Sequence, residues 1–94
     1  MQIAWTAAAL RDLAAARDYI AAENPAAAER QVQLILTAVA RLAQFPGIGR
    51  PGRVPGTREL VIVRTPYLVP YRLSGETVEI ARVLHARQRW PTRM

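Results

Sequence analysis

The sequence predicts an α+β fold in a single domain over residues 1–94: a short strand at 2–5, an antiparallel pair of helices, and a three-stranded antiparallel meander. Three observations indicate this order. Apolar residues recur every three or four positions over residues 7–44 and at about every second position over 58–86. Between these regions, residues 46–57 are rich in proline and glycine. We therefore expect one sheet with both helices on the same face.

Local signals define the two helices. Thr6 is a suitable N-cap for a helix from residue 7 to about residue 22. Asn24 is a suitable N-cap for a second helix, with Pro25 at the first helical position, where its missing N–H costs nothing. The apolar pattern of this helix continues to about residue 44. Because the connection is so short, we expect the two helices to pack as an antiparallel hairpin.

The second half of the chain predicts strands. Residues 46–57 contain three prolines and four glycines, so they can form neither a helix nor a central strand. Strands are expected over 58–64, 67–73 and 77–86, and Pro70 predicts an edge position or a bulge in the middle one. The positions expected to be largely buried are Leu10, Leu13, Ile20, Val32, Ile35, Val39, Leu60, Ile62, Val69 and Ile80.

The composition limits the classes of function. The net charge is +6 and all thirteen basic residues are arginine, which indicates an anionic partner such as nucleic acid, a ribosome or an acidic protein. The chain has no cysteine, one histidine and seven scattered acidic residues, so we predict no disulfide, metal site or cofactor. With no signal sequence and no apolar run approaching about 18 residues, we expect a cytoplasmic protein without a membrane partner.

Short motifs occur in a characteristic order along nearly the whole chain. They are Ile3 to Trp5, the A-x-x-D-L of Ala9 to Leu13, Tyr19-Ile20, Asn24-Pro25, Phe45-Pro46, the Gly-Arg pairs at 49–50 and 52–53, Gly56 to Leu60, Thr65 to Arg72, and Arg82 to Pro91. Each motif alone is common, whereas the ordered set resembles the RelE/ParE superfamily. The resemblance implies a toxin that stops growth until a cognate acidic antitoxin from the same operon binds it in a hetero-oligomer.

The resemblance is compatible with two different cellular targets for the toxin. ParE-like members poison DNA gyrase without recognised nuclease chemistry, whereas RelE-like members bind the ribosomal A site and cleave mRNA through the ribose 2′-OH. RelE-like sites use an arginine at the start of the third strand, where this chain has Tyr67, and this chain has no lysine to act as a base. The sequence therefore favours the ParE-like reading, and gyrase as the target. The alternative is a metal-independent, ribosome-dependent endoribonuclease.

The candidate site residues depend on this choice. In a RelE-like enzyme His85 would transfer the proton, since histidine is the side chain that normally titrates near neutral pH, and Arg58 and Arg87 would stabilise the phosphate charge. His85 can equally be a structural residue at a strand end. The candidates for target binding are Arg58, Arg64, Arg72, Arg82, Arg87 and Trp90. Each arginine taken singly can instead be a solvated strand-edge residue, and Trp90 can hold the tail by packing. Tyr67 and Tyr71 are expected to face the core.

Overall fold

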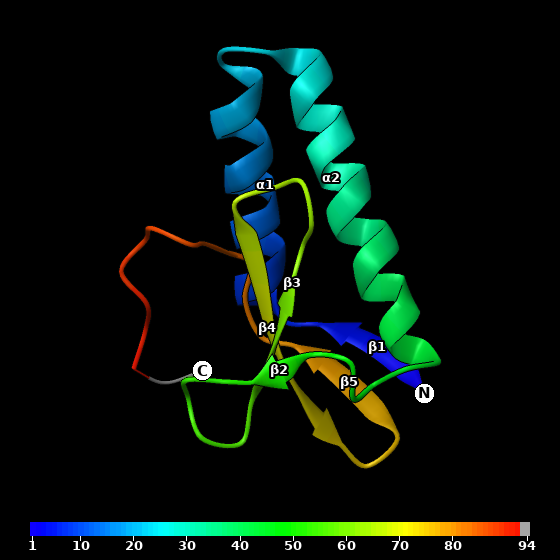
Figure 1. The fold of residues 1–94 in the computed structure, drawn as a ribbon. Helices are drawn as coiled ribbons and strands as arrows, with labels where there is room; N and C mark the ends of the chain where they lie inside the picture. Colours follow the sequence, from blue (N-terminus) through cyan, green and yellow to red (C-terminus); the bar gives the residue numbers. More distant parts are fainter. Residues whose placement is uncertain (93–94) are drawn as a thin grey trace.

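The computed structural model describes residues 1–92 and has the predicted α+β architecture (Figure 1). The elements in chain order are β1 (Gln2–Trp5), α1 (Ala7–Ala21), α2 (Pro25–Ala40), a 3-10 turn η1 (Arg41–Ala43), β2 (Arg50–Pro51), β3 (Arg58–Val61), β4 (Tyr67–Ser74), β5 (Thr77–Ile80) and β6 (Leu84–His85). The two helices form the expected hairpin, and the core lies between them and the sheet. Neither helix within residues 1–92 is long and apolar enough to span a membrane.

The helix caps are confirmed. The Thr6 hydroxyl accepts a hydrogen bond from the Ala9 N–H at 3.0 Å, and the Asn24 side chain accepts one from the Ala27 N–H at the same distance. The Thr6 hydroxyl also donates to the Ala81 carbonyl at 2.9 Å, so one side chain both starts α1 and ties it to the sheet. The second helix was expected to reach about residue 44. It is α-helical as far as Ala40, and the 3-10 turn η1 continues it to Ala43.

The strands form one sheet in the order β1-β5-β4-β3-β2, with β6 also paired to β4. The meander from β3 to β5 is antiparallel, as expected. The first strand, β1, pairs in parallel with β5, from Gln2 opposite Thr77 to Trp5 opposite Ile80. The glycine-rich stretch adds the two-residue edge strand β2, which covers only the start of β3. The β1–β5 pairing joins segments that are distant in sequence, and β2 is only two residues long. The spacing of apolar residues along the chain therefore could not predict either pairing.

Pro70 lies in the central strand β4, so the predicted edge position is wrong, whereas the predicted bulge is present in the facing chain. Between the paired stretches of β4 there are two residues, while the chain opposite has three, 81–83. The Pro70 carbonyl accepts hydrogen bonds from the N–H groups of both Ala81 and Arg82, at 3.0 and 3.4 Å. The extra residue breaks the ladder where Pro70 has no N–H to donate. It also divides the single last strand expected over 77–86 into β5 and β6.

The predicted core is largely confirmed. Seven of the ten expected positions are buried: Val32, Ile35, Val39, Leu60, Ile62, Val69 and Ile80. Leu13 and Ile20 are half-buried against them. Leu10 was wrongly assigned, because its side chain is 52% exposed while the neighbouring Ala9 is fully buried. Adjacent helical residues point about 100° apart, so the buried stripe of α1 is centred on Ala9 and Ala16 and passes beside Leu10.

The central strand β4 is covered on both faces. Tyr67 and Tyr71 face the core, as expected, and are 6% and 0% exposed. Leu68 and Pro70, which alternate with them, are buried as well. Leu73 alternates onto the same face as the tyrosines but is 46% exposed, since this end of β4 leads into the turn to β5.

Candidate functional site

Arg58 begins β3 and holds the glycine-rich loop. Its Nη1 donates to the Gly49 carbonyl at 2.8 Å and to the Gly47 carbonyl at 3.4 Å. Arg58 also lines a pocket of about 310 Å³ together with Arg72. Arg72 makes a cross-strand ion pair with Glu79 at 2.6 Å. Both arginines therefore have structural contacts on this part of the sheet.

His85 lies in β6 and lines a pocket with residues of the turn that joins α1 and α2. Its ring meets the Tyr67 ring edge-on, with centroids 5.5 Å apart. Its Nδ1 accepts a hydrogen bond from the Arg87 N–H at 3.0 Å, which assigns the proton of the neutral ring to Nε2. Burial raises the pKa of the Tyr67 hydroxyl, and the nearby Tyr19 adds to this effect. The two tyrosines, His85 and Gln31 share a pocket of about 290 Å³ with residues of the helix turn.

The structure does not bring the three catalytic candidates together. Arg87 lies beside His85, but Arg58 is opposite Tyr71, whereas His85 is opposite Tyr67. Tyr67 and Tyr71 are four residues apart on one strand, so the two sites are separated by about 13 Å along the sheet. They also line different pockets.

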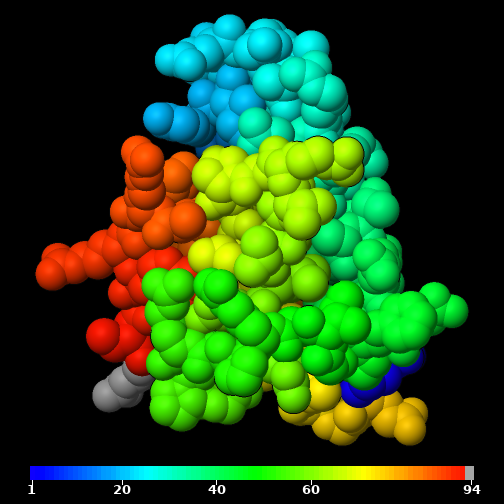
Figure 2. All heavy atoms as spheres, viewed as in Figure 1, coloured from blue at the N-terminus to red at the C-terminus, as the bar shows by residue number. Residues whose placement is uncertain are grey.

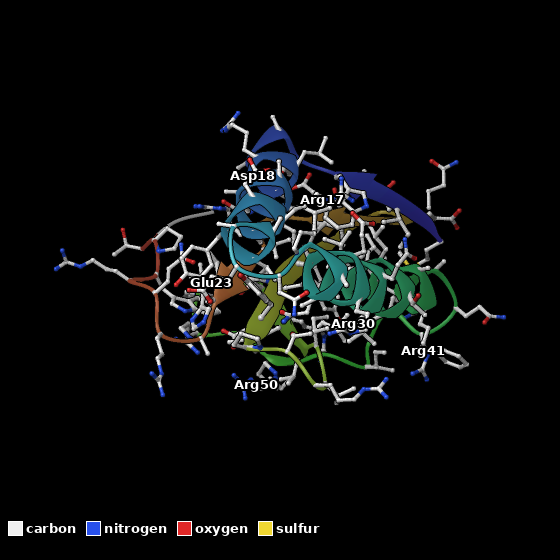
Figure 3. All side chains as sticks on the ribbon, turned by 90° about the horizontal axis from the view of Figure 1, so that it is seen from above. Arg17, Asp18, Glu23, Arg30, Arg41 and Arg50 are labelled. Carbon is white, nitrogen blue, oxygen red and sulfur yellow. The ribbon has the colours of Figure 1, made fainter. Side chains whose placement is uncertain are left out.

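The remaining arginine candidates occupy separate places. Arg82 is held by Asp12 of α1 through two hydrogen bonds of 2.6 and 3.0 Å, and this contact raises the pKa of Arg82 against the opposing effect of burial. Arg64 lies in the turn between β3 and β4 with φ 65°, and lines a groove of about 670 Å³ beside α2. Figure 3 shows further arginines on separate elements, with Arg17 on α1, Arg30 on α2 and Arg50 in β2. Within residues 1–92 the arginines therefore lie on several different elements, and Arg64 lines a different pocket from Arg58 and Arg72.

A buried ionic cluster was missed by the sequence reasoning. Glu59 is 3% exposed, and its carboxylate pairs with Arg50 at 3.1 Å and Arg53 at 3.3 Å and accepts the Arg53 backbone N–H at 2.8 Å. Burial alone would raise the pKa of Glu59, but the hydrogen bonds and charges of the two arginines together hold it below its ordinary value. One signal was visible, since Glu59 is the only acidic residue between Glu29 and Glu76.

Trp90 packs on this cluster. The Arg53 guanidinium carbon lies 3.6 Å from the centre of the Trp90 ring. Figure 2 shows the green loop and the red tail side by side on one face of the molecule. Within residues 1–92, no group of three or more histidine, cysteine or acidic side chains is arranged to hold a metal ion.

Glu59 should make stability depend on pH in the acid range. Because its folded pKa lies below the unfolded value of 4.5, the carboxylate stabilises the fold above that pH, and this contribution is lost as the pH falls through the folded pKa. We expect Glu59→Gln to lower the free energy of unfolding by about 1–3 kcal/mol at pH 7 and to approach wild type in acid. Urea titrations at both pH values measure this. The exposed Glu76→Gln is the control, and a pH-independent difference would contradict the assignment.

Comparison with known proteins places the chain in a family. The family model described as the ParE toxin of the type II toxin-antitoxin system, parDE, matches residues 3–90. The putative toxin Y4kP of Sinorhizobium fredii is 51% identical over 90 residues, which cover 96% of this chain and 93% of that protein. Toxin RelE2 of Caulobacter vibrioides is 42% identical over 85 residues, covering 90% of this chain and 94% of that one.

A solved structure supports the same family assignment. The chromosomal ParDE TA system from P. aeruginosa contains a chain that superposes with a TM-score of 0.81 at 36% sequence identity, covering 90% of this chain and 95% of that one. The fold, the ordered motifs and the match over nearly all of the sequence thus agree with one another. The chain belongs to the ParE family of toxins of type II toxin–antitoxin systems.

Proposed function

We propose that this toxin stops growth in the cytoplasm by binding and poisoning DNA gyrase, and that it does not itself cut RNA. The main support is the separation of about 13 Å along the sheet between Arg58 and His85. Cleavage through a 2′-OH needs a base and a group that stabilises the phosphate charge, both within hydrogen-bond reach of one nucleotide. Here Arg58 donates to the Gly49 carbonyl of the glycine-rich loop. His85 Nδ1 already accepts the Arg87 N–H, so this nitrogen is occupied by a local turn.

The second part of the proposal is the partner. A net charge of +6 favours an acidic antitoxin segment, encoded in the same operon, that forms a hetero-oligomer with the toxin. Exposed arginines on several sides of the fold suit a segment that wraps around it. The structural relative named as a ParDE TA system supports the same kind of assembly.

The test compares wild type, His85→Ala and His85→Asn in cells. With wild type, we expect DNA damage signalling to begin before protein synthesis falls. Both variants should keep toxicity within about ten-fold of wild type, because removing one hydrogen bond of this kind costs about 1 kcal/mol. Asparagine should stay closer to wild type, since its carbonyl oxygen can replace Nδ1 as the acceptor for the Arg87 N–H.

A nuclease would behave differently. If His85 transferred the proton, both variants would lose about 100- to 10,000-fold in rate, asparagine included. Ribosome-dependent cleavage of a reporter mRNA by wild type, lost in both variants, would overturn the gyrase proposal. Co-expression of the neighbouring reading frame is the control, and it should restore growth if that frame encodes the antitoxin.

A further inference from the structure

The segment from His85 to Trp90 is fixed at its first end by a closed turn. The His85 N–H donates to the Gln88 side-chain oxygen, and the Gln88 N–H donates to the His85 carbonyl, each at 3.0 Å. The Arg87 N–H donates to His85 Nδ1, also at 3.0 Å. Three hydrogen bonds over four residues determine the direction in which the chain leaves β6.

The second end is fixed through the sheet. Arg53 lies over the Trp90 ring at 3.6 Å, and Arg53 is itself held twice by Glu59 Oε2, through its backbone N–H at 2.8 Å and its Nε at 3.3 Å. Glu59 belongs to β3 and is 3% exposed, so it does not move independently of the sheet. Contacts therefore run from β3 through Glu59 and Arg53 to Trp90.

Two arginines lie between these ends. Arg87 and Arg89 are exposed, and neither forms an ion pair within residues 1–92. A basic loop held at both ends has less conformational freedom to lose on binding than a free tail has. The arrangement therefore fixes the backbone positions from which the two arginine side chains extend into solvent.

We infer that Glu59 and Arg53 are positioning residues that hold the basic loop, residues 85–90, in the form that the toxin's target binds. They act through Trp90, and Arg87, Arg89 and Trp90 make the contacts with the target. The inference rests on the proposed function, in which the toxin stops growth by binding its target, and it places the binding contacts in the C-terminal segment, residues 85–90. It adds two residues that lie outside that segment and assigns them a geometric role.

Arg50 provides a matched control. Arg50 and Arg53 both pair with Glu59, at 3.1 and 3.3 Å, but it is Arg53 that lies over Trp90. In a Trp5→Phe background Trp90 is the single tryptophan of the chain. Arg53→Gln should raise acrylamide quenching of its fluorescence roughly two-fold, because the ring loses the cation that covers one face. Arg50→Gln should leave quenching unchanged, and Arg53→Lys, which keeps the charge, should restore part of the protection.

The same variants, with Trp5 retained, are then compared for growth inhibition at equal expression and at known melting temperatures. Arg53→Gln should weaken inhibition roughly ten-fold, as expected for about 1.4 kcal/mol of lost preorganisation, and Arg50→Gln should not. Unchanged quenching in Arg53→Gln would overturn the inference, and so would equal loss of inhibition in both variants. If Trp5→Phe does not fold, hydrogen exchange of residues 86–92 in the otherwise native chain replaces the fluorescence.

The two proposals fail in distinguishable ways. Quenching reports the position of Trp90 and does not depend on any target. Wild type that inhibits growth without affecting gyrase contradicts the proposed function, while the Arg53 and Arg50 comparison still decides the role of the loop. Increased quenching in Arg53→Gln with full growth inhibition would show that the contact exists and would overturn its positioning role.

Discussion

Replacing Leu42 with alanine should lower the free energy of unfolding by about 2–5 kcal/mol, the usual cost of emptying a buried leucine site. Leu42 lies in η1, is 0% exposed and belongs to the main core cluster. The total free energy of unfolding of a small domain is only about 5–15 kcal/mol, so this loss is a large fraction of its stability. Urea unfolding followed by circular dichroism measures it.

The control for this cavity is Leu10→Ala. The Leu10 side chain is 52% exposed on the outer side of α1, so its truncation should change stability by no more than about 0.5 kcal/mol. Both variants remove the same atoms from a helical leucine. Equal losses in the two would contradict the burial described for α1 and η1.

Replacing Gly49 with alanine should destabilise the fold by about 1–3 kcal/mol, as overpacking of a filled site does. A Cβ at Gly49 would lie 2.6 Å from both Cε1 and the hydroxyl oxygen of Tyr71. The Tyr71 ring cannot move away without breaking hydrogen bonds, because its hydroxyl accepts the Gly49 N–H at 2.9 Å and donates to the Pro46 carbonyl at 2.7 Å. The melting temperature should fall by several degrees.

Gly47→Ala is the matched control. No atom lies within 4 Å of a Cβ built at Gly47, two residues earlier in the same loop. Its stability should remain within about 0.5 kcal/mol of wild type. If Gly49→Ala were equally harmless, Tyr71 would have to be free to move, and its two hydrogen bonds could not hold the loop.

What the sequence could predict was local. Thr6, Asn24 and Pro25 act within one turn of their own positions, and all three were identified correctly. Leu10 was placed wrongly because a period of three to four residues indicates that a helix has a buried stripe but does not decide between neighbouring alanine and leucine positions. The parallel partner of β1 depends on pairing between residues far apart in the chain.

The candidate site shows the same division. The sequence identified the arginines and His85 as charged or titratable residues, but their partners are distant. Arg82 is bound by Asp12, 70 positions earlier, and Arg53 meets both Glu59 and Trp90. Residue type alone could not show that Arg58 and His85 lie at different positions along the sheet, since this follows from the register of β3, β4 and β6.

The parallel pairing of β1 with β5 has a consequence for the order of events during synthesis. The first strand of the chain finds its place only beside residues 77–80, and Thr6 bonds to Ala81 across 75 positions. Closing so long a loop is entropically costly, and non-local strand pairs form slowly. A nascent chain can form the helical hairpin on the ribosome. The pairing of β1 with β5, which completes the sheet, requires that residue 81 has left the exit tunnel. The complete toxin surface therefore cannot form before residue 81 has emerged from the ribosome.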